Sequence, residues 1–243
     1  MANSLVLLDK EQIATIEQLV RAFLRLPFFE GVPGKVMEKI HAHVHSATVL
    51  GTYDFIDIVD PIRRIGWQVK STQKSTPVTW KRAKIPAKEE LIDLSRQSKD
   101  GRQRLGNAII DYCNDHAIES IRKYNLQNLV YARLIDRGNG LYTYFERPLP
   151  ISGILFVPDD FEWNWSVPKE NTKKEQLPAF HGIHAPTGKP FFAWHGLGEN
   201  QLHFKGEYTW WPDENYLYQI NFRSPSTPLS LTELLEILAT VSN

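Results

Sequence analysis

A change of hydrophobic period in the first third of the chain constrains the fold more than any other feature of the sequence. Apolar residues recur at helical spacing over Ile13–Leu24 and again over Lys35–His45. From Thr48 to Thr72 the pattern becomes that of strands rich in β-branched and aromatic residues, interrupted by a turn signal at Asp60-Pro61. We therefore predict two helices followed by a β-hairpin.

The elements that follow indicate a mixed sheet. A short helix is predicted over Glu89–Ser98 and a long amphipathic helix over Arg102–Lys123, and strands over Asn128–Asp136 and Leu141–Arg147 flank the turn signal Gly138-Asn139-Gly140. This order predicts an α/β fold with a mixed β-sheet flanked by helices. The remainder is β-rich and ends in a helix capped by Ser230 and Glu233. Its expected strands are Ile154–Val157, Phe191–His195, Gln201–Phe204 and Tyr216–Phe222.

Length and composition fit one globular protein of a reducing compartment. The 243 residues suit a single domain, 1–243, that needs no metal or disulfide to build a core. Cys113 is the only cysteine, which excludes an internal disulfide and favours the cytoplasm. The N-terminal residues predict no signal peptide, and no apolar run approaches the ~20 residues that cross a bilayer.

The charge is uneven along the chain although the formal net charge is +0. Between Asp60 and Glu89 there is no acidic residue, while this stretch contains eight lysines and arginines. A neutral total therefore leaves room for one strongly positive face, of the kind that binds nucleic acid.

The hairpin brings three functional side chains together. Gln68 and Lys70 are two residues apart on a strand and so share a face. If the turn spans Asp60–Arg64 and Val59 pairs with Ile65, Asp54 lies opposite Lys70, at the ~5 Å separation of cross-strand neighbours. A shift of the register by one residue would favour Asp57 over Asp54, and this alternative stays open.

A carboxylate, an amide and an ammonium group suit phosphodiester cleavage. Asp54 and the side-chain oxygen of Gln68 can bind Mg²⁺, which takes oxygen ligands and lowers the pKa of a bound water. Lys70 can orient the attacking water and stabilise the pentavalent transition state. The sequence thus predicts a catalytic and metal-binding site on this hairpin.

The arrangement of Asp54, a strand, a turn and Gln68-Val69-Lys70 resembles the PD-(D/E)xK nuclease superfamily, which includes most type II restriction endonucleases. The resemblance covers about residues 31–136. Tyr53 replaces the proline and Gln68 the second acid of the family pattern. The resemblance implies a restriction-endonuclease-like fold and a further acid on the preceding helix, where Glu38 lies. It also implies a sequence-specific, Mg²⁺-dependent endonuclease acting on double-stranded DNA as a homodimer, with residues 148–223 forming recognition and dimerisation elements.

Several donors after the hairpin are expected to contact DNA. The segment from Lys74 to Lys88 is expected to be a basic loop, and hydroxyl, amide and cationic groups bind phosphates and base edges. The predicted DNA-binding residues are Ser71, Thr72, Gln73, Lys74, Lys81, Arg82 and Lys84.

The same residues fit two other functions, and two groups of histidines are candidates for a metal site. A repair or junction-resolving nuclease of the same fold, or a non-catalytic DNA-binding protein, fits the same residues. His181, His184, His195 and His203 lack the cysteines and paired acids of a structural zinc site, so none is predicted there. His41, His43 and His45 cannot all face one ion.

Overall fold

The computed structural model describes residues 9–51, 54–73, 76–167, 177–205, 218–223 and 228–241. The chain forms two compact units. Unit 1 comprises Met1–Thr76, Tyr124–Leu149 and Asn215–Asn243, and unit 2 comprises Pro77–Lys123 and Pro150–Glu214. Each unit contains its own β-sheet, so the protein is a mixed α/β fold with two sheets. The range 31–136, predicted as one catalytic core, contains segments of both units.

Two helices begin unit 1 where the sequence predicts them. Helix α1 (Lys10–Leu24) starts at a capping box, in which Gln12 N donates to Asp9 Oδ1 at 2.8 Å and Asp9 N donates to Gln12 Oε1 at 3.0 Å. Helix α2 (Gly34–His45) ends at Ser46, which adopts a left-handed conformation with a φ of 52°. Both helices are confirmed.

Unit 1 contains a six-stranded sheet in the order β1-β2-β3-β5-β6-β11. Strand β5 runs parallel to β3, and every other neighbouring pair is antiparallel. The connection from β3 to β5 is a crossover through the segment 77–123 of unit 2. The strands are β1 (Thr48–Val49), β2 (Ile58–Asp60), β3 (Ile65–Gln73), β5 (Asn128–Gly138), β6 (Leu141–Leu149) and β11 (Tyr218–Arg223).

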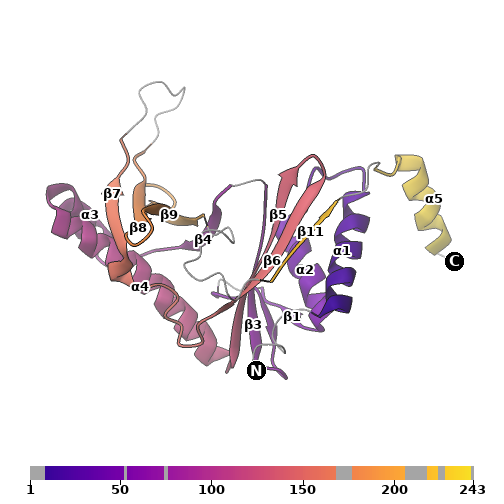
Figure 1. The fold of residues 1–243 in the computed structure, drawn as a ribbon, viewed down its shortest axis with the longest axis horizontal. Coiled ribbons are helices and arrows are strands. Elements are labelled where there is room, and N and C mark those ends of the chain that lie inside the picture. Colours follow the sequence, from indigo (N-terminus) through magenta and orange to yellow (C-terminus); the bar gives the residue numbers. More distant parts are fainter. Residues whose placement is uncertain are drawn as a thin grey trace. The chain divides into compact units, whose positions relative to one another are not determined.

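The hydrophobic core of unit 1 lies between one face of this sheet and the two N-terminal helices (Figure 1). Trp67 and Val69 of β3 contribute to it, as do Val130 and Leu134 of β5. Because side chains alternate along a strand, the residues between them face the opposite side of the sheet. This alternation directs Gln68 and Lys70 away from α1 and α2.

Unit 2 contains a five-stranded antiparallel sheet in the order β4-β10-β9-β8-β7, together with α3 (Lys88–Gln97) and α4 (Lys99–Lys123). Its strands are β4 (Val78–Arg82), β7 (Phe161–Trp165), β8 (Phe180–His184), β9 (Lys189–His195) and β10 (Gln201–Phe204), with the short helix η2 (Pro158–Asp160) before β7. Helix α4 packs closely on β7, because a Cβ at Gly106 would lie 2.1 Å from the Trp163 ring. Gly106 therefore allows the helix backbone to approach the indole.

Two expectations for unit 2 are wrong, and two of its strands are not predicted by the sequence pattern. The segment Lys74–Lys88 is not a continuous loop, because β4 forms where buried Val78 and Trp80 alternate with exposed Thr79. Ile154–Val157 is not a strand. Leu155 N and Phe156 N donate instead to Asn114 Oδ1 of α4 at 3.0 and 3.3 Å. Strands β7 and β8 were not predicted.

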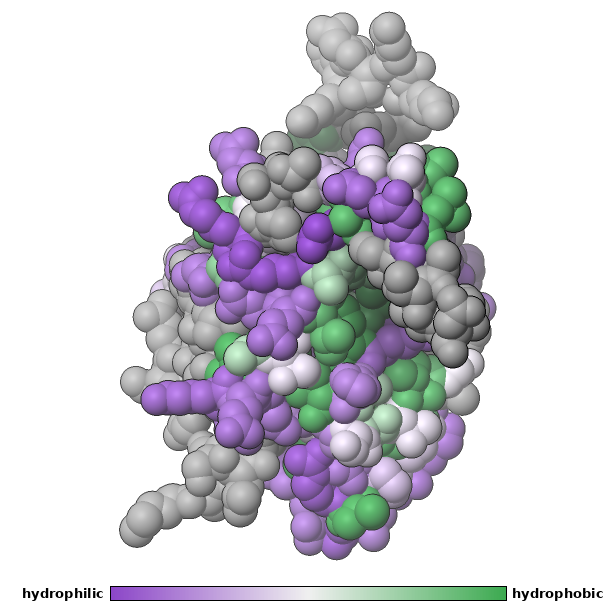
Figure 2. All heavy atoms as spheres, turned by 90° about the vertical axis from the view of Figure 1, so that its right-hand side faces the viewer, coloured by the Kyte–Doolittle hydropathy of each residue, from purple (hydrophilic) through white to green (hydrophobic). Residues whose placement is uncertain are grey.

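The C-terminal helix begins where the sequence predicts it. Helix α5 (Leu231–Val241) has the predicted capping box, with Ser230 N donating to Glu233 Oε2 at 2.7 Å and Glu233 N to Ser230 Oγ at 3.2 Å. On the side of the molecule shown in Figure 2, hydrophobic side chains reach the surface between hydrophilic ones. In the described part of the chain, no helix combines the length and the apolar character that a membrane span requires.

Candidate functional site

The turn of the β2–β3 hairpin fixes the register of the site. The Asp60 carboxylate accepts hydrogen bonds from Ile62 N and Arg63 N, both at 2.9 Å. Arg64 then adopts a left-handed conformation with a φ of 58°. Asp60 is therefore the last residue of β2 and pairs directly with Ile65. The loop between them consists of residues 61–64 alone.

This register differs by one residue from the predicted one. Val59 pairs with Gly66 rather than Ile65, because Asp60 belongs to the strand and not to the turn. The prediction that Asp54 lies opposite Lys70 is wrong for this reason. A shift of one residue exchanges the side chains that face each side of a sheet. The sequence leaves Asp57 open as the alternative acid for this shift.

Asp57 is the carboxylate that the structure brings to Lys70. Its backbone N donates to Trp67 O at 2.8 Å. Its Oδ2 atom accepts Val69 N at 2.9 Å and Lys70 Nζ at 3.2 Å. These contacts hold Asp57 against β3 on either side of Gln68. The Asp57 and Lys70 side chains are 22% and 21% exposed, so the pair is anchored yet open to solvent.

Asp54 has a different role. Its Oδ2 atom accepts a hydrogen bond of 2.6 Å from the hydroxyl of Tyr124, which follows α4. This contact joins the segment before β2 to the segment before β5. The structure therefore gives Asp54 a contact with Tyr124, and it is Asp57 that contacts Lys70.

The face of the sheet that carries Gln68 and Lys70 is rich in positive charge. Pairing across the sheet places Gln68 beside Tyr131 and Lys70 beside Arg133, and Tyr131 in turn pairs with Arg147. Arg133 is fully buried, and its guanidinium donates to Thr72 Oγ1 at 2.9 Å and to Thr76 O at 2.8 Å. Burial raises the pKa of Tyr131 to about 12, so its hydroxyl stays protonated at neutral pH.

Helix α2 contributes a second carboxylate. Glu38 is 6% exposed and accepts a hydrogen bond of 2.7 Å from Lys35 Nζ. This bond raises the pKa of Lys35, with a further contribution from the negative charge of Asp57. An electrostatic link therefore runs from the start of α2 to the Asp57–Lys70 pair. This agrees with the predicted place of Glu38 on the helix before the hairpin.

The predicted DNA-contacting residues fall in both units. Ser71, Thr72 and Gln73 line a pocket of about 330 Å³ in unit 1, where Ser71 Oγ also donates to Val32 O at 2.6 Å. Lys81 and Arg82 lie on β4 of unit 2, and Lys84 follows that strand. Lys74 lies outside the described residues.

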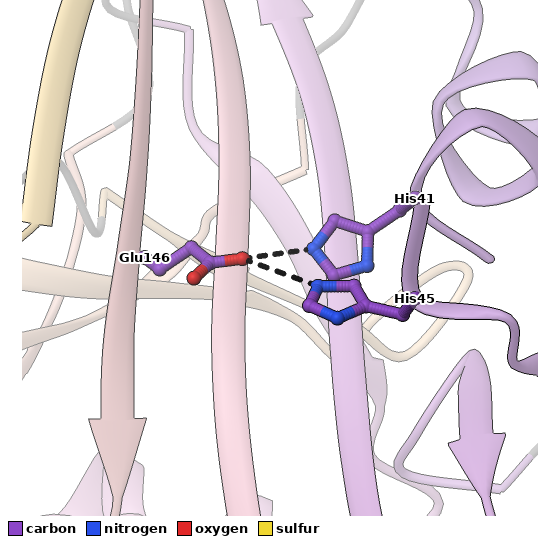
Figure 3. Close-up of side chains that lie close together, drawn as sticks. All are labelled: His41, His45 and Glu146. Carbon is purple, nitrogen blue, oxygen red and sulfur yellow. Dashed lines mark hydrogen bonds and ion pairs between the residues drawn. The ribbon is translucent and has the colours of Figure 1, made fainter. Parts of the chain in front are cut away.

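A second cluster, formed by His41, His45 and Glu146, lies on the opposite face of the same sheet. In Figure 3 both imidazoles project from α2 toward the Glu146 carboxylate on β6. His41 Nε2 lies 3.0 Å and His45 Nε2 lies 3.9 Å from Glu146 Oε1, and the Tyr144 hydroxyl donates to the same oxygen at 2.7 Å. All three cluster side chains are buried.

Only part of this cluster was accessible to sequence reasoning. His41 and His45 are four residues apart and so share one helix face, whereas His43 is exposed. That spacing was the available signal. Glu146 follows His41 by 105 residues, and β-strand pairing alone brings the two together. Among the described residues this is the one group of three or more histidine, cysteine or acidic side chains whose ligand atoms converge.

The unit 2 histidines do not converge on a shared acid within the described residues. His184 Nδ1 lies 2.8 Å from Thr187 Oγ1, and the rings of His195 and His203 are tilted relative to each other with centroids 4.6 Å apart. Burial lowers the pKa of His181 and of His203. His181, His195 and His203 line a cavity of about 840 Å³ together with apolar side chains.

Comparison with known proteins gives no match. Neither a family model, nor a curated protein, nor a solved structure matches this chain. The side-chain geometry described above is therefore what supports a function.

Proposed function

We propose that this chain is a Mg²⁺-dependent DNA endonuclease whose active site consists of Asp57, Gln68 and Lys70. The observation that carries the proposal is the 3.2 Å contact between Lys70 Nζ and Asp57 Oδ2. The pair is partly exposed to solvent, and Gln68 lies between the two β3 positions that Asp57 contacts. A carboxylate and an ammonium group thus meet at one place, and Gln68 lies on the same strand and the same face as Lys70.

The arrangement of the surrounding elements supports the same proposal. Helix α2 precedes the antiparallel strands β1, β2 and β3, and a crossover containing a long helix leads to β5, which is parallel to β3. This is the order of elements on which the resemblance to the PD-(D/E)xK nucleases rests. With Asp57 in place of Asp54, the acid and Gln68-Val69-Lys70 fall on neighbouring segments of one hairpin.

The oxygen donors of the site fit a magnesium ion. Carboxylate and amide oxygens are its preferred protein ligands, and Asp57 and Gln68 supply one of each. Glu38, on the helix before the hairpin, is the further acid that the resemblance implies, and it accepts a hydrogen bond from Lys35. When bound, the ion supplies a water of lowered pKa and neutralises charge on the phosphate.

Lys70 and the neighbouring cations supply the remaining electrostatic stabilisation. The Lys70 ammonium is held by the Asp57 carboxylate at a position where it can orient a water and stabilise an anionic phosphorane. Arg133 and Arg147 on the same face make the local potential more positive. These residues favour a phosphodiester as the substrate over an uncharged ester.

The partner in this proposal is double-stranded DNA, bound by a homodimer with two-fold symmetry. The pocket beside Ser71, Thr72 and Gln73 and the cations Lys81, Arg82 and Lys84 supply donors for phosphates and base edges. A symmetric dimer would match a palindromic site. Light scattering with and without a DNA duplex measures that assembly state directly.

Digestion of a mapped plasmid tests the proposed function. The purified full-length chain with Mg²⁺ or Mn²⁺ is expected to give discrete fragments, and sequencing of their ends would identify the site. Asp57→Asn is expected to abolish cleavage and to retain DNA binding in Ca²⁺, whereas the matched variant Asp54→Asn retains cleavage. An uncut plasmid over a range of salt concentrations would contradict the proposal.

The same assay separates the two alternative functions. Cleavage confined to branched or damaged duplexes would identify a repair or junction-resolving nuclease. DNA binding that Lys70→Ala leaves intact, without cleavage of any substrate by the wild type, would identify a non-catalytic DNA-binding protein.

A further inference from the structure

His45 is a buried imidazole whose polar atoms have no hydrogen bond within the described residues. It is 3% exposed, and neither Nδ1 nor Nε2 has a hydrogen-bond partner. Its ring packs against Trp67 with centroids 4.4 Å apart, while Nε2 faces Glu146 Oε1 at 3.9 Å. A buried polar group without a partner costs about 1–3 kcal/mol, so a bound ligand at this nitrogen would remove a penalty.

The spacing of the three ligand atoms suits a small cation between them. The ligand atoms of His41, His45 and Glu146 all lie within 4.8 Å of one another. A tetrahedral zinc ion with bonds of about 2.0–2.1 Å separates its ligand atoms by roughly 3.3 Å. The contacts of 3.0 and 3.9 Å between Glu146 Oε1 and the two Nε2 atoms bracket that separation.

The chemistry of the three side chains also suits a metal. Divalent ions are coordinated by imidazole nitrogens and by ionised carboxylates. His41, His45 and Glu146 supply two imidazoles and one carboxylate whose ligand atoms lie close together.

We propose that His41, His45 and Glu146 form a structural site for a divalent ion of the zinc class, which ties α2 to β6. The donor set decides the choice of metal, because imidazole nitrogens favour zinc whereas magnesium takes oxygen ligands. The Tyr144 hydroxyl, 2.7 Å from Glu146 Oε1, fixes the carboxylate from the side of the sheet. All three ligands are buried, so the ion would be enclosed within unit 1.

This site is independent of the proposed nuclease activity, although it bears on the same helix. Helix α2 carries Lys35 and Glu38 near its start and the two histidines nearer its end. An ion between α2 and β6 would fix the helix against the sheet on the face opposite Lys70. The bound ion can be measured in the absence of DNA, so this test does not depend on the nuclease activity.

Metal analysis of the full-length chain, produced without an affinity tag in zinc-supplemented medium, tests the proposal. Elemental analysis is expected to find about one zinc per chain in the wild type, as for a single site. His43→Gln is the matched control, because His43 is exposed on the same helix, and it is expected to retain the zinc. His45→Gln and Glu146→Gln are expected to lose it.

A second measurement needs no variant. Wild-type protein refolded from urea with chelator and then supplied with Zn²⁺ is expected to gain roughly 5–10 °C in Tm, and Co²⁺ is expected to give the visible absorption of a tetrahedral centre. Mg²⁺ is expected to produce neither effect. Two results would together overturn the site. The first is a wild-type chain that contains no zinc, or no more zinc than His45→Gln. The second is a Tm of the refolded wild type that Zn²⁺ leaves unchanged.

Discussion

The two faces of the unit 1 sheet carry different groups of polar side chains, which differ in their exposure to solvent. On the face toward α1 and α2, two imidazoles and one carboxylate are sealed inside an apolar core beside Trp67. On the other face, Asp57 and Lys70 remain about one-fifth exposed. Strand β3 supplies residues to both faces, with Trp67 and Val69 on the first and Gln68 and Lys70 on the second.

The difference shows how one sheet can separate two chemistries. A nitrogen-rich buried cluster suits a permanently held ion, whereas oxygen donors beside a partly exposed ion pair suit an exchangeable ion and a substrate. The buried cluster is expected to govern stability, and the partly exposed site is expected to govern activity. A variant of the buried cluster should therefore lower stability more than activity. A variant of the Asp57–Lys70 site should lower activity more than stability.

Lys70→Ala is expected to give the largest effect. Loss of one preorganised charge at a transition state lowers the rate by about 100–1,000-fold. Single-turnover cleavage of a DNA duplex in Mg²⁺ measures this directly. Lys70→Arg serves as the control that keeps the charge and changes the geometry. A Lys70→Ala rate within tenfold of the wild-type rate would assign the chemistry to another group.

Glu146→Gln is expected to have the next largest effect, which is a loss of stability rather than of activity. Loss of the negative charge weakens the hydrogen bonds that Glu146 accepts in the core, and should lower the free energy of unfolding by about 2 kcal/mol. The matched change Asp57→Asn, at the partly exposed pair on the other face, is expected to alter it by less than about 1 kcal/mol. Urea unfolding monitored by tryptophan fluorescence compares them. Equal losses in both variants would refute the contrast between the faces.

Asp60→Asn tests the turn that sets the register. Burial raises the pKa of Asp60, but hydrogen bonds from Arg63 and Ile62 outweigh it, so the pKa lies below the ordinary 3.8. The ionised carboxylate therefore stabilises the fold above about pH 4, and this contribution disappears as the pH falls through the lowered folded-state pKa. The variant is expected to lose about 1 kcal/mol at neutral pH. The difference from the wild type should shrink in acid, and a constant difference down to pH 2 would argue against the ionised role.

Tyr124→Phe is expected to give the smallest effect. It removes the 2.6 Å hydrogen bond to Asp54 and should lower the free energy of unfolding by about 1 kcal/mol. Cleavage is expected to stay within a few-fold of the wild-type rate, because this contact involves neither Asp57 nor Lys70. A large loss of cleavage with unchanged stability would indicate that Asp54 belongs to the active site.

The local elements of unit 1 were predictable because their signals are local. The capping boxes at Asp9 and Ser230, the extent of α2 and the pairing of β5 with β6 follow from sequence spacing and turn residues. Unit 2 was less predictable. The sequence pattern does not predict strands β7 and β8, and it predicts a strand over Ile154–Val157 although Asn114 of α4 binds the backbone there.

The sequence by itself determined the α/β order of elements, the hairpin and the shared face of Gln68 and Lys70, because helix and strand periods are written in consecutive residues. Only the tertiary structure decided that Asp57 rather than Asp54 meets Lys70, since the Asp60 side chain sets a register that spacing leaves open by one residue. It also decided that His41 and His45 face Glu146. Contacts between residues about a hundred positions apart depend on how strands pair across a sheet, and no local pattern specifies that pairing.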